Sequence, residues 1–132
     1  MANRMTIEPM IYPTDHRGLV MEPIGPDALP HQQNVHLALT GPGHIRGNHY
    51  HKRGNEVVVV LGPALVRYRE EQGEEIQDLH IPQGQAYRLK IPAGVSHAFQ
   101  NPGPTPMVII AFNTVVHDPD HPDVVRDVLI EA

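Results

Sequence analysis

The chain has 132 residues and a mass of 14.7 kDa, which suffices for one domain of ordinary size but not for two. Its formal net charge is −5 and no window concentrates Lys and Arg, so neither nucleic acid nor an anionic membrane is an expected partner. Cysteine is absent, which excludes disulfides and thiolate metal sites, and the ten histidines are therefore the main candidates for chemistry.

Neither a membrane-spanning segment nor a secretory leader is predicted. The longest apolar stretch covers ten positions, residues 57–66, and is interrupted by Gly62 and Pro63, whereas a helix needs about 20 residues to cross a bilayer. The first ten residues, MANRMTIEPM, lack an apolar signal core. We therefore expect residence in the cytoplasm.

Short apolar or alternating runs, each bounded by Gly, Pro, Asn or Asp, predict β-strands along nearly the whole chain. In chain order they cover residues 5–11, 19–23, 34–40, 45–51, 56–61, 64–69, 76–81, 86–91, 97–101 and 107–113. The run 57–61 is apolar at every position, which predicts burial on both of its faces. After Pro122, apolar residues with a 3–4 spacing predict a short C-terminal helix. The sequence thus predicts a single all-β domain over residues 1–132, a sandwich or a barrel.

One group of side chains stands out on these strands. His49 and His51 are two residues apart, so they point to the same face of their strand. Residues 52–55 are typical of a tight turn, which would bring Glu56 back level with the two histidines on the next antiparallel strand. A turn at residues 92–94 begins the strand that carries His97. Three imidazoles and a carboxylate can then converge from three strands.

Such a set of donors suits a divalent ion: Fe(II), Mn(II), Ni(II), Co(II) or Zn(II). In an octahedral site it leaves two positions for water or substrate. A polar pocket without metal is the alternative. His36, on a neighbouring predicted strand, could line the same cavity, whereas the other histidines are individually expected to be ordinary surface or core residues.

The two segments resemble the two motifs of the cupin superfamily. Their matching positions are Gly43, His49, His51, Glu56 and Gly62 in the first motif, and Gly84, Pro92, Gly94, His97 and Asn101 in the second. The second motif departs from the family pattern in having seven residues, rather than five, before its proline. The resemblance implies a double-stranded β-helix, or jelly-roll barrel, that is usually dimeric and holds a metal inside the barrel mouth.

A narrower resemblance joins Asp15-His16-Arg17-Gly18, the segment 45–52 and the tail 117–123. In this order they are similar to segments of cupin-type deoxysugar-nucleotide epimerases and ketoisomerases. That resemblance implies proton abstraction next to a ketone on a nucleotide-linked sugar, with His49 or the pair His49 and His51 as base. It also implies that Arg17 and Arg46 hold the diphosphate.

Two features of the chain depart from that pattern. The epimerases carry a tyrosine as general acid after the second motif, and no tyrosine follows Tyr87 here. Tyr50, Tyr68 and Tyr87 are candidate replacements only if the fold aims one of them inward. In addition, His49 cannot serve as base and as metal ligand through the same nitrogen.

Three functions therefore stay open. The leading hypothesis is a metal-binding cupin enzyme that acts on a small oxygenated molecule, most specifically an isomerase or epimerase of nucleotide-linked ketosugars. A metal-dependent dioxygenase is the second hypothesis, and a non-catalytic ligand-binding or sensor cupin is the third. We also expect a homodimer, because the run 57–61 and the N-terminal strand need cover that a chain of this length does not readily supply.

Overall fold

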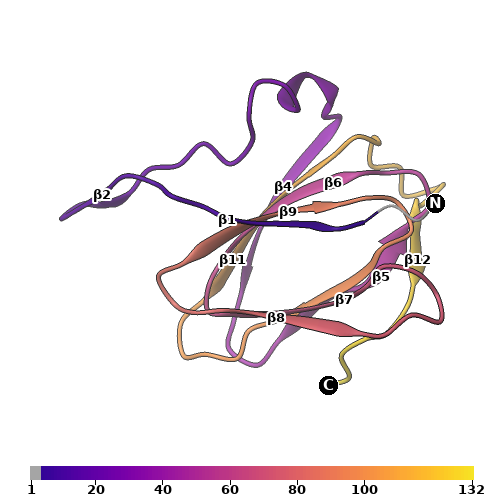
Figure 1. Cartoon of the computed structure of the whole chain (residues 1–132). Coiled ribbons are helices and arrows are strands. Elements are labelled where there is room, and N and C mark those ends of the chain that lie inside the picture. The colour runs from indigo at the N-terminus through magenta and orange to yellow at the C-terminus, as the bar shows by residue number, and fades with distance from the viewer. Residues whose placement is uncertain (1–3) are drawn as a thin grey trace.

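A computed structural model describes residues 4–132. Two antiparallel sheets of five strands face each other and enclose the interior of a barrel (Figure 1). The upper sheet has the order β1 (Thr6–Pro9), β9 (Ala86–Ile91), β6 (Glu56–Leu61), β11 (Met107–Asn113) and β4 (Asn34–Thr40). The lower sheet has the order β12 (Val124–Arg126), β5 (Ile45–His51), β10 (Ser96–Gln100), β7 (Ala64–Arg69) and β8 (Gln77–Ile81). The predicted all-β barrel is confirmed.

Six of the predicted strands have the bounds that the sequence indicates: β4, β5, β6, β7, β9 and β11. The run in β6 is buried along Val57–Val60, as predicted. Val58 and Val60 belong to the core cluster between the sheets. The alternation of a strand turns Val57 and Val59 to the outer side. On that side the segment 20–33 crosses the sheet. Arg88 holds this segment by donating hydrogen bonds to the carbonyls of Glu22 and Pro23.

The predicted hairpin between β5 and β6 is wrong. The two strands belong to different sheets, and residues 52–55 carry the chain from one sheet to the other. The reason is topological, because β5 pairs with β10 and β12, while β6 pairs with β9 and β11. Glu56 therefore faces the histidines of β5 across the barrel interior instead of beside them in one sheet.

The predicted C-terminal helix is also wrong. Residues 124–126 form β12, which pairs with His51, Tyr50 and His49 at the edge of the lower sheet. Across residues 4–132 the helical structure is limited to a 3-10 turn, η1 (Leu29–His31). A helix of fewer than about 12 residues is marginal without strong packing, whereas pairing with β5 satisfies backbone groups on an open edge. Tertiary pairing therefore overrides the local 3–4 spacing.

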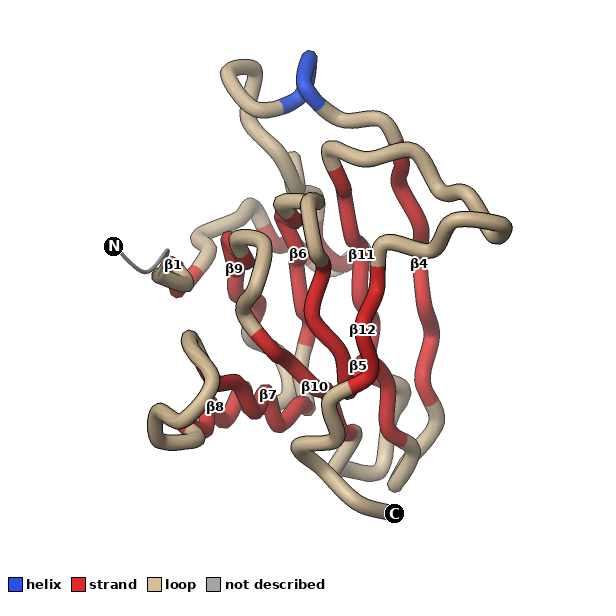
Figure 2. Tube along the Cα trace, turned by 90° about the vertical axis from the view of Figure 1, so that its right-hand side faces the viewer, coloured by secondary structure: helices blue, strands red, loops and turns tan. Residues whose placement is uncertain are grey.

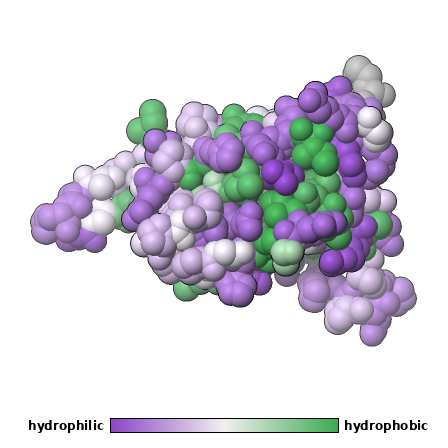
Figure 3. Space-filling model, turned by 90° about the horizontal axis from the view of Figure 1, so that it is seen from below, coloured by the Kyte–Doolittle hydropathy of each residue, from purple (hydrophilic) through white to green (hydrophobic). Residues whose placement is uncertain are grey.

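The N-terminal part carries a projecting arm, residues 10–20, with the small hairpin β2 (Thr14–Asp15) and β3 (Gly18–Leu19). Figure 2 shows β4 at the opposite edge of the upper sheet, away from the N-terminal strand β1. Seen from below, hydrophobic residues gather in the middle of the molecule, while hydrophilic residues cover most of the arm at the left (Figure 3). Within the described part of the chain, no helix has the length and hydropathy needed to traverse a membrane.

Candidate functional site

A β-bulge aims the first histidine into the barrel. On β10, His97 and Ala98 oppose His49 and Gly47 of β5, so Asn48 has no partner and forms the extra residue. Gly47 has φ +86°, and a Cβ there would lie 2.8 Å from the carbonyl oxygen of His97, so only glycine fits. The bulge leaves His49 directly across from His97, with ring centroids 4.9 Å apart.

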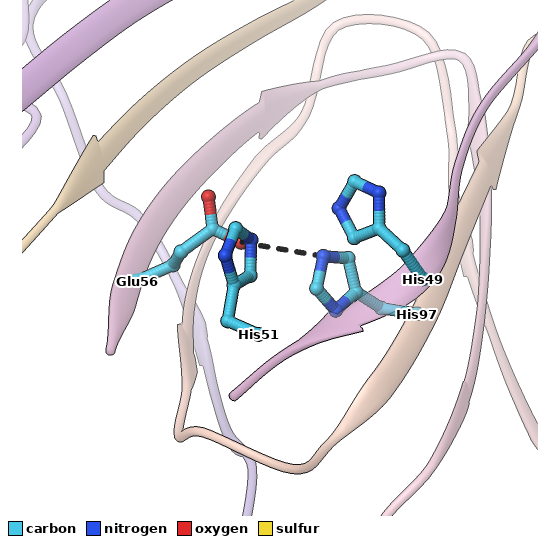
Figure 4. Close-up of side chains that lie close together, drawn as sticks. All are labelled: His49, His51, Glu56 and His97. Atoms are coloured by element: carbon cyan, nitrogen blue, oxygen red, sulfur yellow. Dashed lines mark ion pairs between the residues drawn. The ribbon is translucent and has the colours of Figure 1, made fainter. Parts of the chain in front are cut away.

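The four predicted ligands come together between the two sheets (Figure 4). One potential donor atom from each of His49, His51, Glu56 and His97 lies within 4.8 Å of all the others. Oε1 of Glu56 lies 2.9 Å from Nε2 of His51 and 3.3 Å from Nε2 of His97. The predicted convergence of these side chains is therefore present, although Glu56 reaches it from the opposite sheet.

The imidazoles of His97 and His51 differ in their hydrogen bonding. Nδ1 of His97 donates a hydrogen bond to the carbonyl oxygen of Val95 at 3.0 Å, which leaves the lone pair of Nε2 toward Glu56. Nε2 of His51 is buried and, despite its closeness to Glu56, has no aligned hydrogen-bond partner among residues 4–132. Imidazole nitrogens and a carboxylate gathered at one point, with the carbonyl of Val95 fixing the tautomer of His97, fit a divalent cation.

Charges in the cluster are strongly coupled. Burial, together with the neighbouring His97 and His51, lowers the pKa of His49 to about 4, so this ring is neutral at physiological pH. Burial by itself would raise the pKa of Glu56, but His51 and His97 hold it well below its ordinary value. Burial by itself would lower the pKa of His51, but the carboxylates of Glu56 and Asp123 outweigh burial and raise it.

The cluster lines a cavity of about 580 Å³, a size typical of small-molecule sites. Apolar side chains, including Val58, Phe99 and Ile109, cover much of its wall. Polar residues are as numerous along the wall but expose less surface to the cavity, and they can fix the orientation of a ligand. The arrangement can exclude water from a bound molecule and present it with imidazole and carboxylate groups.

Two of the three predicted substrate-binding residues line this cavity. His36 lies on β4 and Arg46 on β5. Nε of Arg46 donates a hydrogen bond to Oγ1 of Thr40 at 2.8 Å, which fixes the guanidinium at the cavity wall. Arg17 lies elsewhere: it is exposed on the projecting arm and pairs with Asp15. Arg17 does not line the cavity of its own chain. Its role in binding the diphosphate therefore stays a prediction.

The candidate tyrosines do not line the cavity. Tyr68 is buried in the core cluster and its hydroxyl donates to Oε1 of Gln77 at 3.3 Å. Tyr87 is half-buried and packs against the same cluster. Direct acid catalysis by either residue therefore finds no support in this geometry.

Sequence reasoning missed several residues that line the cavity, among them Asn34, Asn113, Asp118 and Asp123. Asn113 and Asp123 approach Nδ1 of His51 at 3.5 and 3.6 Å. The segment 117–123 does carry a signal in the resemblance described above, but no role follows from it. Nothing in the local sequence around Asn113 distinguishes it from other strand-end asparagines.

Two facing sheets with a histidine and carboxylate cluster between them define a cupin-like jelly-roll barrel. The family model for the polysaccharide biosynthesis C-terminal domain matches residues 13–125, so the chain belongs to this family. A curated relative is the spore coat polysaccharide biosynthesis protein SpsL of Bacillus subtilis strain 168, 28% identical over 131 residues. The alignment covers 93% of this chain and 87% of SpsL.

Solved structures agree with the fold. The capsular polysaccharide assembling protein CapF of Staphylococcus aureus is 29% identical with a TM-score of 0.68, but the match covers 74% of this chain and only 27% of CapF. ChmJ, a 3'-monoepimerase from Streptomyces bikiniensis solved with dTDP-quinovose, has a TM-score of 0.74 at 16% identity, covering 90% and 68%. QdtA, a sugar 3,4-ketoisomerase from Thermoanaerobacterium thermosaccharolyticum solved with TDP, has a TM-score of 0.69 at 19% identity, covering 96% and 90%.

Proposed function

We propose that the chain is a sugar-nucleotide isomerase or epimerase, which either moves the ketone of a nucleotide-linked sugar to the neighbouring carbon or inverts the centre next to that ketone. One observation carries the proposal: a neutral imidazole, His49, stands inside a cavity of suitable size beside a buried anionic group, in a chain of a polysaccharide biosynthesis family. The names of ChmJ and QdtA describe reactions of this type, which supports the choice of substrate class. Residence in the cytoplasm stays a prediction.

In this proposal each residue has a defined task. A ring nitrogen of His49, whose lone pair is free because the ring is neutral, takes the proton from the carbon next to the ketone. The protonated ring then gives the proton to the neighbouring carbon in an isomerisation, whereas an inversion needs a proton from the opposite face of the enolate. Arg46, at the cavity wall, binds the anionic diphosphate with its guanidinium. The apolar wall around Phe99 excludes water while the enolate exists. His51 and His97 hold the polar end of the site with Glu56.

A divalent ion is the second part of the proposal, and His51, Glu56 and His97 are its ligands, with His49 as a possible fourth. When bound, the ion would polarise the ketone and stabilise the negative charge of the enolate. Among the described residues Glu56 lies within ion-pair distance of His51 and His97 but not of His49, whose ring centroid lies 5.1 Å from that of His51 and 4.9 Å from that of His97 (Figure 4). This asymmetry supports His49 as the base and the other three residues as ligands.

The test uses the whole chain and a panel of nucleotide-linked ketosugars in deuterated water, with NMR to follow exchange of the proton next to the ketone. Metal content is measured on the same samples by elemental analysis. We expect exchange by the unmodified protein, a loss of at least about 100-fold in His49→Gln with metal retained, and a loss of metal in His97→Gln. Absence of exchange across the panel would remove the proposed function. Oxygen uptake with Fe(II) would support a dioxygenase, and tight ligand binding without turnover would support a sensor.

The third part of the proposal is a homodimer. On the outer side of β4, a stripe of three apolar side chains is more than half exposed: Val35, Leu37 and Leu39. The projecting arm also carries apolar residues in solvent, with Ile11 fully exposed and Val20 72% exposed. An apolar sheet face and a free apolar arm on the same chain are complementary surfaces for a symmetric pair, in which each copy covers the other.

Light scattering tests the dimer. We expect a mass of twice 14.7 kDa, which falls toward a single chain in Leu37→Asp. Val116→Asp, an exposed apolar position on the loop after β11, is the matched control and should stay dimeric. A mass of 14.7 kDa for the unmodified protein at working concentration would contradict the dimer without touching the proposed chemistry.

A further inference from the structure

His51 differs from the other histidines of the cluster because a carboxylate lies behind it. Its Nε2 faces Glu56 inside the cavity, whereas its Nδ1 lies 3.6 Å from Oδ2 of Asp123. Asp123 stands 72 positions further along the chain, directly before β12. The C-terminal segment therefore brings a second carboxylate to the outer side of a candidate metal ligand.

Asp123 is held in this position by contacts that do not involve His51. Its Oδ2 accepts a hydrogen bond from the backbone N–H of Gly54 at 2.8 Å, and its Oδ1 accepts one from the N–H of Arg53 at 3.0 Å. The N–H of Lys52 donates to its carbonyl oxygen at 2.8 Å. The carboxylate is only 10% exposed, so it has little contact with solvent. Because its carboxylate is fixed by these contacts, Asp123 can determine the orientation of the His51 ring.

Asn113 opposes Asp123 at the same nitrogen. Its Oδ1 accepts a hydrogen bond from the N–H of Val115 at 2.8 Å, which turns its Nδ2 donor toward Nδ1 of His51 at 3.5 Å. Asn113 therefore favours an unprotonated Nδ1, and Asp123 favours a protonated one. Which tautomer prevails depends on whether the charged acceptor outweighs the neutral donor, and hydrogen bonds with a charged partner are roughly twice as strong.

We propose that Asp123 is the positioning residue of His51: its carboxylate accepts a hydrogen bond from the N–H of Nδ1, so that Nδ1 keeps the proton and the lone pair of Nε2 points into the cavity toward the cation. The proposal rests on the proposed metal site. His97 has the equivalent arrangement, in which the carbonyl of Val95 is the acceptor. Outer partners of this kind fix the tautomer of a metal-binding histidine, and their loss typically costs 10- to 100-fold in metal affinity.

A matched variant separates this role from a purely structural one. Asp127 also ties the C-terminal segment to the barrel, through Ser96 and Arg69, but it does not contact the His51 ring. Asp123→Asn and Asp127→Asn therefore remove the same charge from the same segment. Only the first removes the acceptor behind His51.

The experiment measures Zn(II) affinity by competition with a chromophoric chelator, using the whole chain. We expect Asp123→Asn to bind Zn(II) about 10- to 100-fold more weakly than the unmodified protein, and Asp127→Asn to bind within about threefold of it. Equal affinities for Asp123→Asn and the unmodified protein would overturn the proposal, and so would an equal loss in both variants.

A second readout needs no catalysis. Imidazole ¹⁵N chemical shifts of the unmodified protein report which nitrogen of His51 carries the proton, with and without Zn(II). A protonated Nδ1 in both states supports the proposal, and in Asp123→Asn without metal the proton should move to Nε2, which faces Glu56. An unprotonated Nδ1 in the unmodified protein would overturn it. If the unmodified protein binds no Zn(II), the metal site fails, and these shifts alone decide whether Asp123 orients His51.

Discussion

The two ends of the chain are attached to the barrel in different ways. The arm at residues 10–20 makes mainly local contacts, such as the pair between Arg17 and Asp15, and leaves Ile11 in solvent. The C-terminal segment is bound by partners about 30 to 80 positions away, among them Asn48 and Ser96. The arm has the clearer sequence motif, but the C-terminal segment reaches the cluster. Long-range hydrogen bonds, rather than local pattern, decide which end helps to build the site.

The largest effect is expected at Asn48, the bulge residue that clamps the C-terminal segment. Its Oδ1 accepts hydrogen bonds from the N–H groups of Leu129 and Ile130, and its Nδ2 donates to the carbonyl of Ile130. It also has φ 59°, which asparagine tolerates better than alanine. We expect Asn48→Ala to lower the free energy of unfolding by about 4 kcal/mol, the sum of three hydrogen bonds and the backbone cost. Urea denaturation measures it, and a loss below about 1 kcal/mol would mean that the clamp is not needed.

Packing of the same segment gives the next effect. Leu129 is 7% exposed and belongs to a small cluster with Ala98 and Ile130 on the outer side of the lower sheet. Leu129→Ala should cost about 3 kcal/mol, because burial is lost and a cavity remains. Ile11→Ala on the arm is the control, and in the single chain it removes no buried contact. Equal unfolding midpoints for the two variants would contradict the contrast between the chain ends.

Asp127 adds an electrostatic contribution of smaller size. The hydrogen bond from the hydroxyl of Ser96 has the largest effect on the pKa of Asp127 and lowers it, and Arg69 and Gln72 lower it further. Burial acts in the opposite direction but is outweighed. Because the pKa is lower in the folded state, the stabilisation is present above the unfolded value of about 3.9 and is lost as pH falls through the lowered folded value. Asp127→Asn should therefore cost about 2 kcal/mol at neutral pH. Unfolding measured from pH 7 to pH 2 should show this difference shrink at the acid end, and a constant difference would refute the assignment.

The smallest effect is expected on the arm. Arg17 is exposed, and within the described part of the chain its ion-pair partner is its neighbour Asp15. Exposed ion pairs of this kind contribute little to stability. Arg17→Ala should leave the unfolding midpoint of the protein unchanged within error in a thermal melt. A clear decrease would show that the arm is held by contacts beyond the single chain, and would sharpen the case for the dimer.

The sequence by itself determined the strands and the identity of the cluster. Alternation and turn residues define most strand bounds, and the two-residue spacing of His49 and His51 places both rings on one face, because the side-chain period of a strand is two. These features depend on local geometry alone, so they can be predicted from the sequence.

Only the tertiary structure decided how these parts meet. In the tertiary structure Glu56 lies in the opposite sheet from His49 and His51, and Asp123 lies behind His51. Residues 124–126 pair with β5 and do not form a helix. The tertiary structure also separated Tyr68, Tyr87 and Arg17 from the cavity, although their residue types suit catalysis or binding. The physical reason is that sheet pairing and long-range hydrogen bonds must satisfy every buried backbone group at once, and no local window contains that constraint.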